Sequence, residues 1–223
     1  LMLGDCLERM KEIESGSVDM ILTDPPYGTT ACKWDSIIPL EPMWEQLKRI
    51  IKPNGAIVLT ANQPFTSLLG VSNIKYLKYS WTWRKSRATG HLNAKKMPMK
   101  DCEDILVFYR KSPTYNPQGV VKCNKIAMNS RSHSERGSTK DPTTVVANAM
   151  RHEEYKQYLT NYPRQILDFA SEGKPVHGSQ KPVALMEYLI KTYTNESETV
   201  LDFTMGSGTT GVAAKNLNRN FIG

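Results

Sequence analysis

The chain has 223 residues and a formal net charge of +7, and 39% of its residues are hydrophobic. This length suits one α/β domain with a small inserted lobe, and the composition excludes wholesale disorder. No apolar run approaches the ~20 residues of a membrane span, and the first residues lack the features of a signal peptide. We therefore expect a cytoplasmic protein without membrane contact. Its four cysteines lack metal-clip spacing, so we expect reduced thiols and no metal site.

The positive charge is concentrated in one part of the chain. Residues 75–100 hold eight Lys or Arg and no acidic residue, and residues 75–140 hold 15 basic and 4 acidic residues, a net of +11. The remaining 14 basic and 18 acidic residues give a net of −4. A charge run is often only a solvated face, but an excess this one-sided favours contact with a polyanion such as a nucleic acid.

The first half of the chain alternates between strands and helices. Residues 18–23 form an apolar run that ends at two prolines, which is typical of a strand followed by a rigid loop. Apolar residues at helical spacing over 43–51 predict a helix, and residues 56–60 predict a second buried strand. Strand, helix and strand in this order indicate a right-handed parallel crossover. Two more strands are expected, around 81–83 and over 105–109.

From residue 111 to about residue 165, polar residues, Gly and Pro dominate, which predicts an inserted region. Regular elements return after it. They are a helix over 182–193, a strand over 199–202 and a glycine turn over 205–208, followed by a helix over 209–217 and a strand that starts at Phe221. In the helix over 209–217 we expect Val212, Ala213 and Leu217 to face inward. The elements together predict an α/β protein.

The loop Asp24-Pro25-Pro26-Tyr27 carries the clearest chemistry. It follows a buried strand at the carboxyl end of the sheet, where the sites of α/β proteins form. The exocyclic amine of adenine or cytosine is a poor nucleophile. The Asp24 carboxylate and the Pro25 carbonyl can accept its two N–H groups and aim its lone pair at a methyl sulfonium. Pro25 and Pro26 keep the loop rigid, and Tyr27 can stack on a base turned out of a duplex. An ordinary Asp-Pro turn is the alternative interpretation.

A second motif spans residues 202–209, which a strand enters and a helix leaves. Gly206 and Gly208 let the backbone approach a ligand closely, and the helix N-terminus offers free N–H donors. This pattern predicts a nucleotide-type site, although such a turn on its own also serves plain strand–helix packing.

The two motifs in this order make the chain resemble the bacterial and phage amino-methyltransferases that act on DNA. Their catalytic motif is [D/N/S]-P-P-[Y/F/W], their cofactor motif is commonly D-P-F-x-G-S-G-T, and in their β group the catalytic motif comes first, as here. The resemblance implies a Rossmann-like fold of the S-adenosylmethionine-dependent methyltransferases, with a mostly parallel twisted sheet and helices on both faces. Residues 1–110 and 173–223 would be its catalytic and cofactor halves, and residues 111–172 its inserted target-recognition region.

The resemblance also implies roles for single residues. Asp24, Pro25, Pro26 and Tyr27 would be catalytic. S-adenosylmethionine, the methyl donor, would be bound by Asp5, Cys6, Asp24, His177, Ser179, Lys181, Asp202, Thr204, Met205, Gly206, Ser207, Gly208 and Thr209. Phe203-Thr204 departs from the Pro-Phe of the family. The acid that binds the ribose in the family would follow Gly223, and the chain does not begin with a start methionine. We therefore expect the natural protein to extend beyond both ends of this chain.

The function implied is methyl transfer to N6 of a flipped adenine in double-stranded DNA. In the family, Asp at the first position of the loop favours adenine N6 as the target, and Ser favours cytosine N4. The alternatives are transfer to cytosine N4, transfer to RNA or to a protein glutamine, and a decayed DNA-binding subunit. Trp81 and Trp83 would form either the base pocket or a covered sheet face. The resemblance also allows two protein partners, a second copy of the chain and a cognate restriction endonuclease. The expected DNA contacts lie in the basic stretch, at Arg84, Lys85, Arg87, Lys95 and Lys96.

Overall fold

The computed structural model describes residues 1–30, 32, 35–128, 154–172 and 180–223. These residues form two compact units, one made of Leu1–Gln118 with Arg164–Gly223, and a smaller one, Gly119–Pro163. The smaller unit lies within the predicted recognition region and holds a two-stranded antiparallel sheet of β5 (Val121–Met128) and β6 (Glu154–Thr160). The larger unit holds the other strands and the helices that the structure describes.

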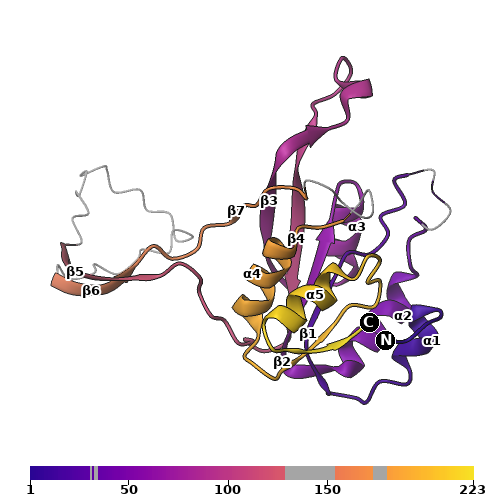
Figure 1. Cartoon of the computed structure of the whole chain (residues 1–223), viewed down its shortest axis with the longest axis horizontal. Coiled ribbons are helices and arrows are strands. Elements are labelled where there is room, and N and C mark those ends of the chain that lie inside the picture. The colour runs from indigo at the N-terminus through magenta and orange to yellow at the C-terminus, as the bar shows by residue number, and fades with distance from the viewer. Residues whose placement is uncertain (31, 33–34, 129–153, 173–179) are drawn as a thin grey trace, which may run out of the picture. The chain divides into compact units, whose positions relative to one another are not determined.

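The larger unit is built on a seven-stranded sheet in the order β7-β3-β4-β2-β1-β8-β9 (Figure 1). Both β2 and β3 pair with β4 antiparallel, and the other pairings in the described sheet are parallel, so the predicted mostly parallel sheet is confirmed. Its strands are β1 (Val18–Thr23), β2 (Ile51–Ala61), β3 (Leu77–Thr89), β4 (Lys100–Phe108), β7 (Ile166–Asp168), β8 (Thr199–Leu201) and β9 (Asn220–Ile222).

Helices cover both faces of the sheet, as predicted (Figure 1). Each face has its own apolar core, with Leu47 buried in one and Leu189 in the other. The prediction that Val212 faces inward is wrong, because Ala213 and Ala214 are the residues that face the sheet and Val212 is 49% exposed. One face carries α1 (Cys6–Met10), α2 (Leu40–Ile50) and α3 (Phe65–Ser72), and the other carries α4 (Val183–Tyr193) and α5 (Thr209–Asn216).

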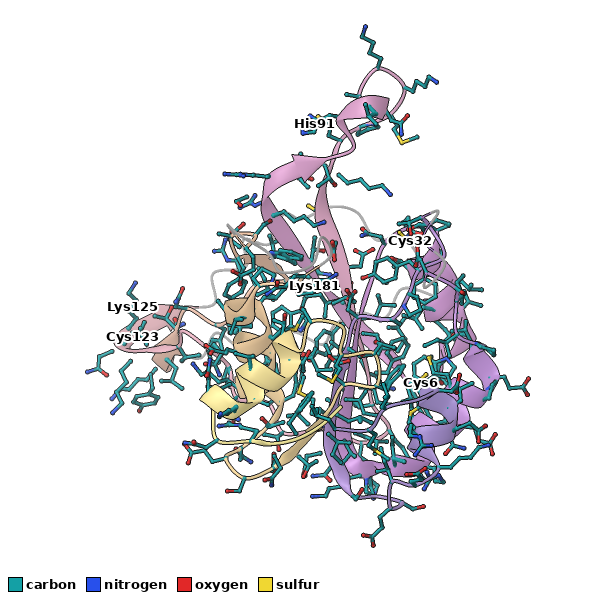
Figure 2. The ribbon with its side chains drawn as sticks, turned by 45° about the vertical axis from the view of Figure 1, so that its right-hand side comes forward. Cys6, Cys32, His91, Cys123, Lys125 and Lys181 are labelled. Atoms are coloured by element: carbon teal, nitrogen blue, oxygen red, sulfur yellow. The ribbon has the colours of Figure 1, made fainter. Side chains whose placement is uncertain are left out.

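Strands β3 and β4 continue past the sheet as a hairpin arm, residues 84–102, with the short 3-10 helix η1 (His91–Asn93) near its tip (Figure 1). Figure 2 shows His91 at the end of this arm and Lys181 in the body of the unit. The two ends of the chain lie side by side, where the N–H of Met2 donates to the carbonyl of Gly223 at 2.7 Å. No described helix combines the length and the apolar character that a bilayer crossing requires.

Candidate active site

The two predicted motifs meet because their strands are neighbours. β1 pairs with β8 in parallel, with Ile21 opposite Leu201. The carboxyl ends of both strands therefore lie at the same edge of the sheet, and the loop after Thr23 faces the turn after Leu201. β2, the other neighbour of β1, pairs Leu59 with Thr23 and so brings Thr60 to the same edge.

The carboxylate of Asp24 is held by three donors from three parts of the chain. Its Oδ1 accepts the hydroxyl of Tyr27 at 2.5 Å and the hydroxyl of Thr60, and its Oδ2 lies 2.7 Å from Nζ of Lys181. The ring of Tyr27 stacks on Phe65 with centroids 5.5 Å apart. Burial, and after it the Asp24 carboxylate, raise the pKa of the Tyr27 phenol. Tyr27 is therefore a neutral donor that orients Asp24, and its stacking on a base stays a prediction.

Asp35, which the sequence does not single out, shapes the same loop. Burial raises the pKa of its carboxyl, but hydrogen bonds to the loop outweigh burial and hold that pKa below its usual range. One ionised side chain thus fixes the backbone that follows the two prolines. The carboxylate is 8% exposed and accepts four backbone N–H groups, those of Tyr27 (2.8 Å) and Gly28 (2.9 Å) at Oδ1 and those of Thr29 (2.9 Å) and Thr30 (2.7 Å) at Oδ2.

Asp202, the first residue of the second motif, is buried just after β8. Its Oδ1 accepts the hydroxyl of Thr23 and, at 3.1 Å, the N–H of Thr204, and burial raises the pKa of its carboxyl to about 6. The Thr204 hydroxyl lies 2.5 Å from that of Thr23 and donates to the backbone carbonyl of Asp24 at 3.1 Å. These bonds join the two loops. Phe203 packs into the apolar core, so a hydroxyl rather than an aromatic ring lies at the junction.

The glycine turn borders a cavity of about 800 Å³, a size typical of small-molecule sites. Gly206 and Gly208 have φ values of 49° and 79°, in the left-handed region that favours glycine. A Cβ at Gly208 would lie 3.3 Å from the Met205 methyl group, which leaves little room for a larger residue. No described side chain caps α5, so the N–H groups of its first turn can bind a ligand. This turn and donor set fit the nucleoside and amino-acid groups of S-adenosylmethionine.

Another wall of the cavity carries a row of alternating charges, Lys85–Glu103–Lys181–Asp24, which we call the charge row. Nζ of Lys181 lies 3.1 Å from Oε2 of Glu103, and the other oxygen of Glu103 pairs with Lys85. Burial alone would lower the pKa of Lys181, but the carboxylates of Asp24 and Glu103 raise it. The sequence does not indicate that Glu103 belongs to this row, because its two partners, Lys85 and Lys181, are distant from it in the chain.

The cavity gathers most of the residues predicted from the sequence, including Pro25, Pro26 and Tyr27. Asp5 instead caps α1 by accepting the N–H groups of Leu7 and Glu8, and Cys6 packs against the apolar core. Their contact with the cofactor stays a prediction. Gly208 shapes the turn without lining the cavity, and His177 and Ser179 lie outside the described residues. Of the predicted cofactor residues, those that line the cavity are Asp24, Lys181, Asp202, Thr204, Met205, Gly206, Ser207 and Thr209.

Three of the basic residues predicted to contact DNA, Arg87, Lys95 and Lys96, are exposed on the hairpin arm. Arg84 is exposed too, but its guanidinium binds the carboxylate of Asp168 on β7 through two bonds of 2.6 and 2.9 Å. The arm therefore presents a positive surface, while Arg84 also ties its base to the edge of the sheet.

Residues at the base of the arm face inward. The side chain of Lys85 is 13% exposed and paired with Glu103, so Lys85 belongs to the cavity wall rather than to a free basic surface. Trp81 is buried and donates from Nε1 to the hydroxyl of Tyr193 at 2.7 Å, as a residue that covers the sheet does. Trp83 is buried but lines the cavity, with Nζ of Lys85 5.4 Å from its ring centroid, and it alone of the two tryptophans can reach a ligand there.

The sheet is mostly parallel with one reversed strand, and the cavity lies at the carboxyl ends of its parallel strands. These features define the class of the protein, the Rossmann-like fold of S-adenosylmethionine-dependent methyltransferases. Within this class the chain belongs to the DNA methylase family (N6_N4_Mtase), whose model matches residues 18–223.

Individual relatives agree with this assignment. The type II methyltransferase M.HpaI of Haemophilus parainfluenzae is 27% identical over 100% of this chain and 68% of its own length. The DNA adenine methyltransferase YhdJ of Escherichia coli is 28% identical over 99% of this chain and 76% of its own length. The structure of the M1.HpyAVI–SAM complex matches with a TM-score of 0.63 at 27% identity, over 100% of this chain and 90% of that one. The cytosine-N4-specific PvuII DNA methyltransferase shares the fold, with a TM-score of 0.67 at 16% identity over 99% and 79% of the two chains.

Proposed function

We propose that this DNA methyltransferase transfers the methyl group of S-adenosylmethionine to the N6 amino group of adenine in double-stranded DNA. One observation carries the proposal, the placement of the Asp24 carboxylate and the glycine turn 205–208 on the walls of one cavity. Membership of the DNA methylase family supports the reaction class. The name of the M1.HpyAVI–SAM complex supports the cofactor.

Bound S-adenosylmethionine supplies an electrophilic methyl group on a sulfonium. The turn 205–208 and the N-terminus of α5 bind it, and the residues of the catalytic loop act on the base. Asp24 accepts one N–H of the exocyclic amine and the backbone carbonyl of Pro25 accepts the other. Both bonds increase the electron density on the nitrogen and hold its lone pair in line with the methyl group. The bond between sulfur and methyl would break as the N–C bond forms, S-adenosylhomocysteine would leave, and the nitrogen would lose its extra proton to solvent. Because Tyr27, Thr60 and Lys181 already hold Asp24, its orientation requires no rearrangement when the base arrives.

Adenine is proposed as the base for two reasons. Asp24 heads the loop, and the related protein YhdJ is named a DNA adenine methyltransferase. The PvuII enzyme is only 16% identical to this chain, so the comparison with it supports the fold but not the identity of the target base. Cytosine N4 is therefore the outcome that the experiment must separate from adenine N6.

Duplex DNA is proposed to contact the hairpin arm 84–102 and the small unit Gly119–Pro163, which together hold much of the excess of basic residues. Relatives named type II methyltransferases support a place in a restriction–modification system. A second copy of the chain and a cognate endonuclease stay predictions.

The test is incubation of the protein with methyl-labelled S-adenosylmethionine and duplex DNA, followed by mass spectrometry of the nucleosides. We expect N6-methyladenine. N4-methylcytosine would keep the mechanism and refute the base, and label in RNA or protein without label in DNA would refute the proposal. Cofactor binding without transfer would favour the decayed subunit.

Asp24→Ala is the matching variant. We expect it to lower kcat by about 10²–10³-fold, the usual effect of removing one aligned hydrogen-bonding group from the transition state. Glu45→Ala, which removes an exposed carboxylate on α2, is the control and should leave kcat unchanged. A large residual rate in Asp24→Ala would contradict the acceptor role.

A further inference from the structure

The charge row brings together four segments that are far apart in the sequence. Lys85 lies on β3, Glu103 on β4, Lys181 just before α4, and Asp24 just after β1. The side chains of Lys181 and Glu103 are each 7% exposed. Buried ion pairs rarely stabilise a fold more than apolar side chains of similar volume do, so stability alone does not explain them. Because these charged side chains also line the cavity, they are candidates for a functional role.

The bonds to Asp24 leave limited room for a substrate. An ionised carboxylate has about four lone-pair positions. Tyr27 and Thr60 occupy positions on Oδ1, and Lys181 occupies one on Oδ2. About one position is therefore left to accept an N–H of the base. The direction of this remaining lone pair depends on how the three donors hold the carboxylate. Lys181 is the donor that fixes Oδ2.

Lys181 can hold Asp24 in one place because it is itself held on two sides. Its ammonium lies between Oδ2 of Asp24 at 2.7 Å and Oε2 of Glu103 at 3.1 Å. Without Glu103 the ammonium would lose its second anchor and its full charge would act on Asp24, which would make that carboxylate a weaker acceptor. Lys85 in turn balances the charge of Glu103, so the two cations and two anions of the row sum to zero.

Resting on the proposed methyl transfer, we infer that Lys181 and Glu103 are positioning residues for that reaction, and that Glu103 acts on Asp24 through Lys181. The bridge Glu103–Lys181–Asp24 orients the catalytic carboxylate before the substrate binds. The role is distinct from cofactor binding, to which the sequence assigned Lys181.

Kinetics test the positioning role. We expect Glu103→Gln and Lys181→Met each to lower kcat by about tenfold or more, because the first removes the ion pair that anchors Lys181 and the second removes the charge-assisted hydrogen bond to Asp24. The Kd for S-adenosylmethionine, measured by calorimetry, should stay within about twofold of wild type. Lys181→Arg should recover much of the loss, because a guanidinium keeps the charge and can bridge two carboxylates. Asp104→Asn is the control, since Asp104 neighbours Glu103 on β4 but binds the Thr66 hydroxyl, a bond that asparagine can keep.

A spectroscopic measurement tests the bridge without relying on activity. In protein labelled with ¹⁵N-lysine, the buried ammonium of Lys181 should give a slowly exchanging signal, assigned by its loss in Lys181→Met. The signal should shift or vanish in Glu103→Gln and in Asp24→Asn, and should stay in Asp104→Asn. If wild-type protein methylates no DNA but shows this pattern, the bridge stands and the proposed function fails.

Three results would overturn the inference. They are wild-type kcat in Glu103→Gln, a loss of cofactor affinity as large as the loss in kcat, and a Lys181 signal that Glu103→Gln leaves unchanged. A Lys181→Arg variant no better than Lys181→Met would also count against it, because a role based on charge and bridging should survive that exchange.

Discussion

Replacing Asp202 with asparagine is expected to stabilise the fold above neutral pH. The Asp202 side chain is 3% exposed, and burial raises the pKa of its carboxyl from 3.8 to about 6. Because the folded-state pKa exceeds the unfolded one, the stability linked to this carboxyl is fully present below the unfolded value and is lost as the pH rises through about 6. A shift of about two units corresponds to about 3 kcal/mol.

Asparagine avoids this loss, since it stays neutral and its carbonyl can still accept the hydroxyl of Thr23 and the N–H of Thr204. We expect the free energy of unfolding of Asp202→Asn to exceed that of wild type by up to about 3 kcal/mol at about pH 8. The difference should fall towards zero as the pH drops below about 3.8, where the carboxyl of Asp202 becomes protonated in the unfolded chain as well as in the folded one. Urea unfolding followed by circular dichroism across this range measures it. A difference that does not change with pH, or a wild type that is the more stable protein at about pH 8, would refute the reasoning.

Three further predictions concern the loop and the arm. Asp35→Asn should lower the free energy of unfolding by about 2 kcal/mol at neutral pH. Because the pKa of Asp35 is depressed, this difference in urea unfolding should shrink as the pH falls through that lowered pKa, and a constant difference would contradict it. Tyr27→Phe, which removes one donor to Asp24, should lower kcat about tenfold in the methyl-transfer assay without changing cofactor affinity. Replacing Lys95 and Lys96 with alanine should reduce the slope of log Kd against log salt by about 2, and an unchanged slope would exclude phosphate contacts there.

Much of the site could be predicted from the sequence, because prolines and glycines interrupt regular structure at definite points. β1 ends at Thr23, directly before the loop 24–27, and α5 begins at Thr209, directly after Gly208. The strand β1 and the helix α2, which precede Gly55, follow from the spacing of their apolar residues. The same is true of the helix α4 and the strand β8, which follow Pro182. The orientation of a short helix cannot be predicted from apolar spacing alone. For this reason the prediction that Val212 faces the sheet is wrong.

The contacts that orient the loop 24–27 could not be predicted, because they depend on strand register and on loop conformation. Thr60 and Glu103 reach Asp24 and Lys181 only because β2 pairs with β1 and with β4 at one edge of the sheet. Asp35 follows the loop by a few residues, and no spacing rule indicates that its carboxylate turns back to bind four N–H groups. A lone acidic residue in a sequence does not reveal which donors it will meet.

The junction between the two loops explains how the chain accommodates its departure from the family motif. Thr204 donates to the backbone carbonyl of Asp24, while Lys181 binds the carboxylate of the same residue, so both ends of Asp24 are held by the protein itself. The aromatic side chain at the preceding position, Phe203, contributes to the core instead of the cavity. The geometry of Asp24 therefore depends on neither an aromatic contact at the second motif nor the cofactor. It follows that the exchange of Pro-Phe for Phe-Thr should alter the affinity for the cofactor more than the choice of base.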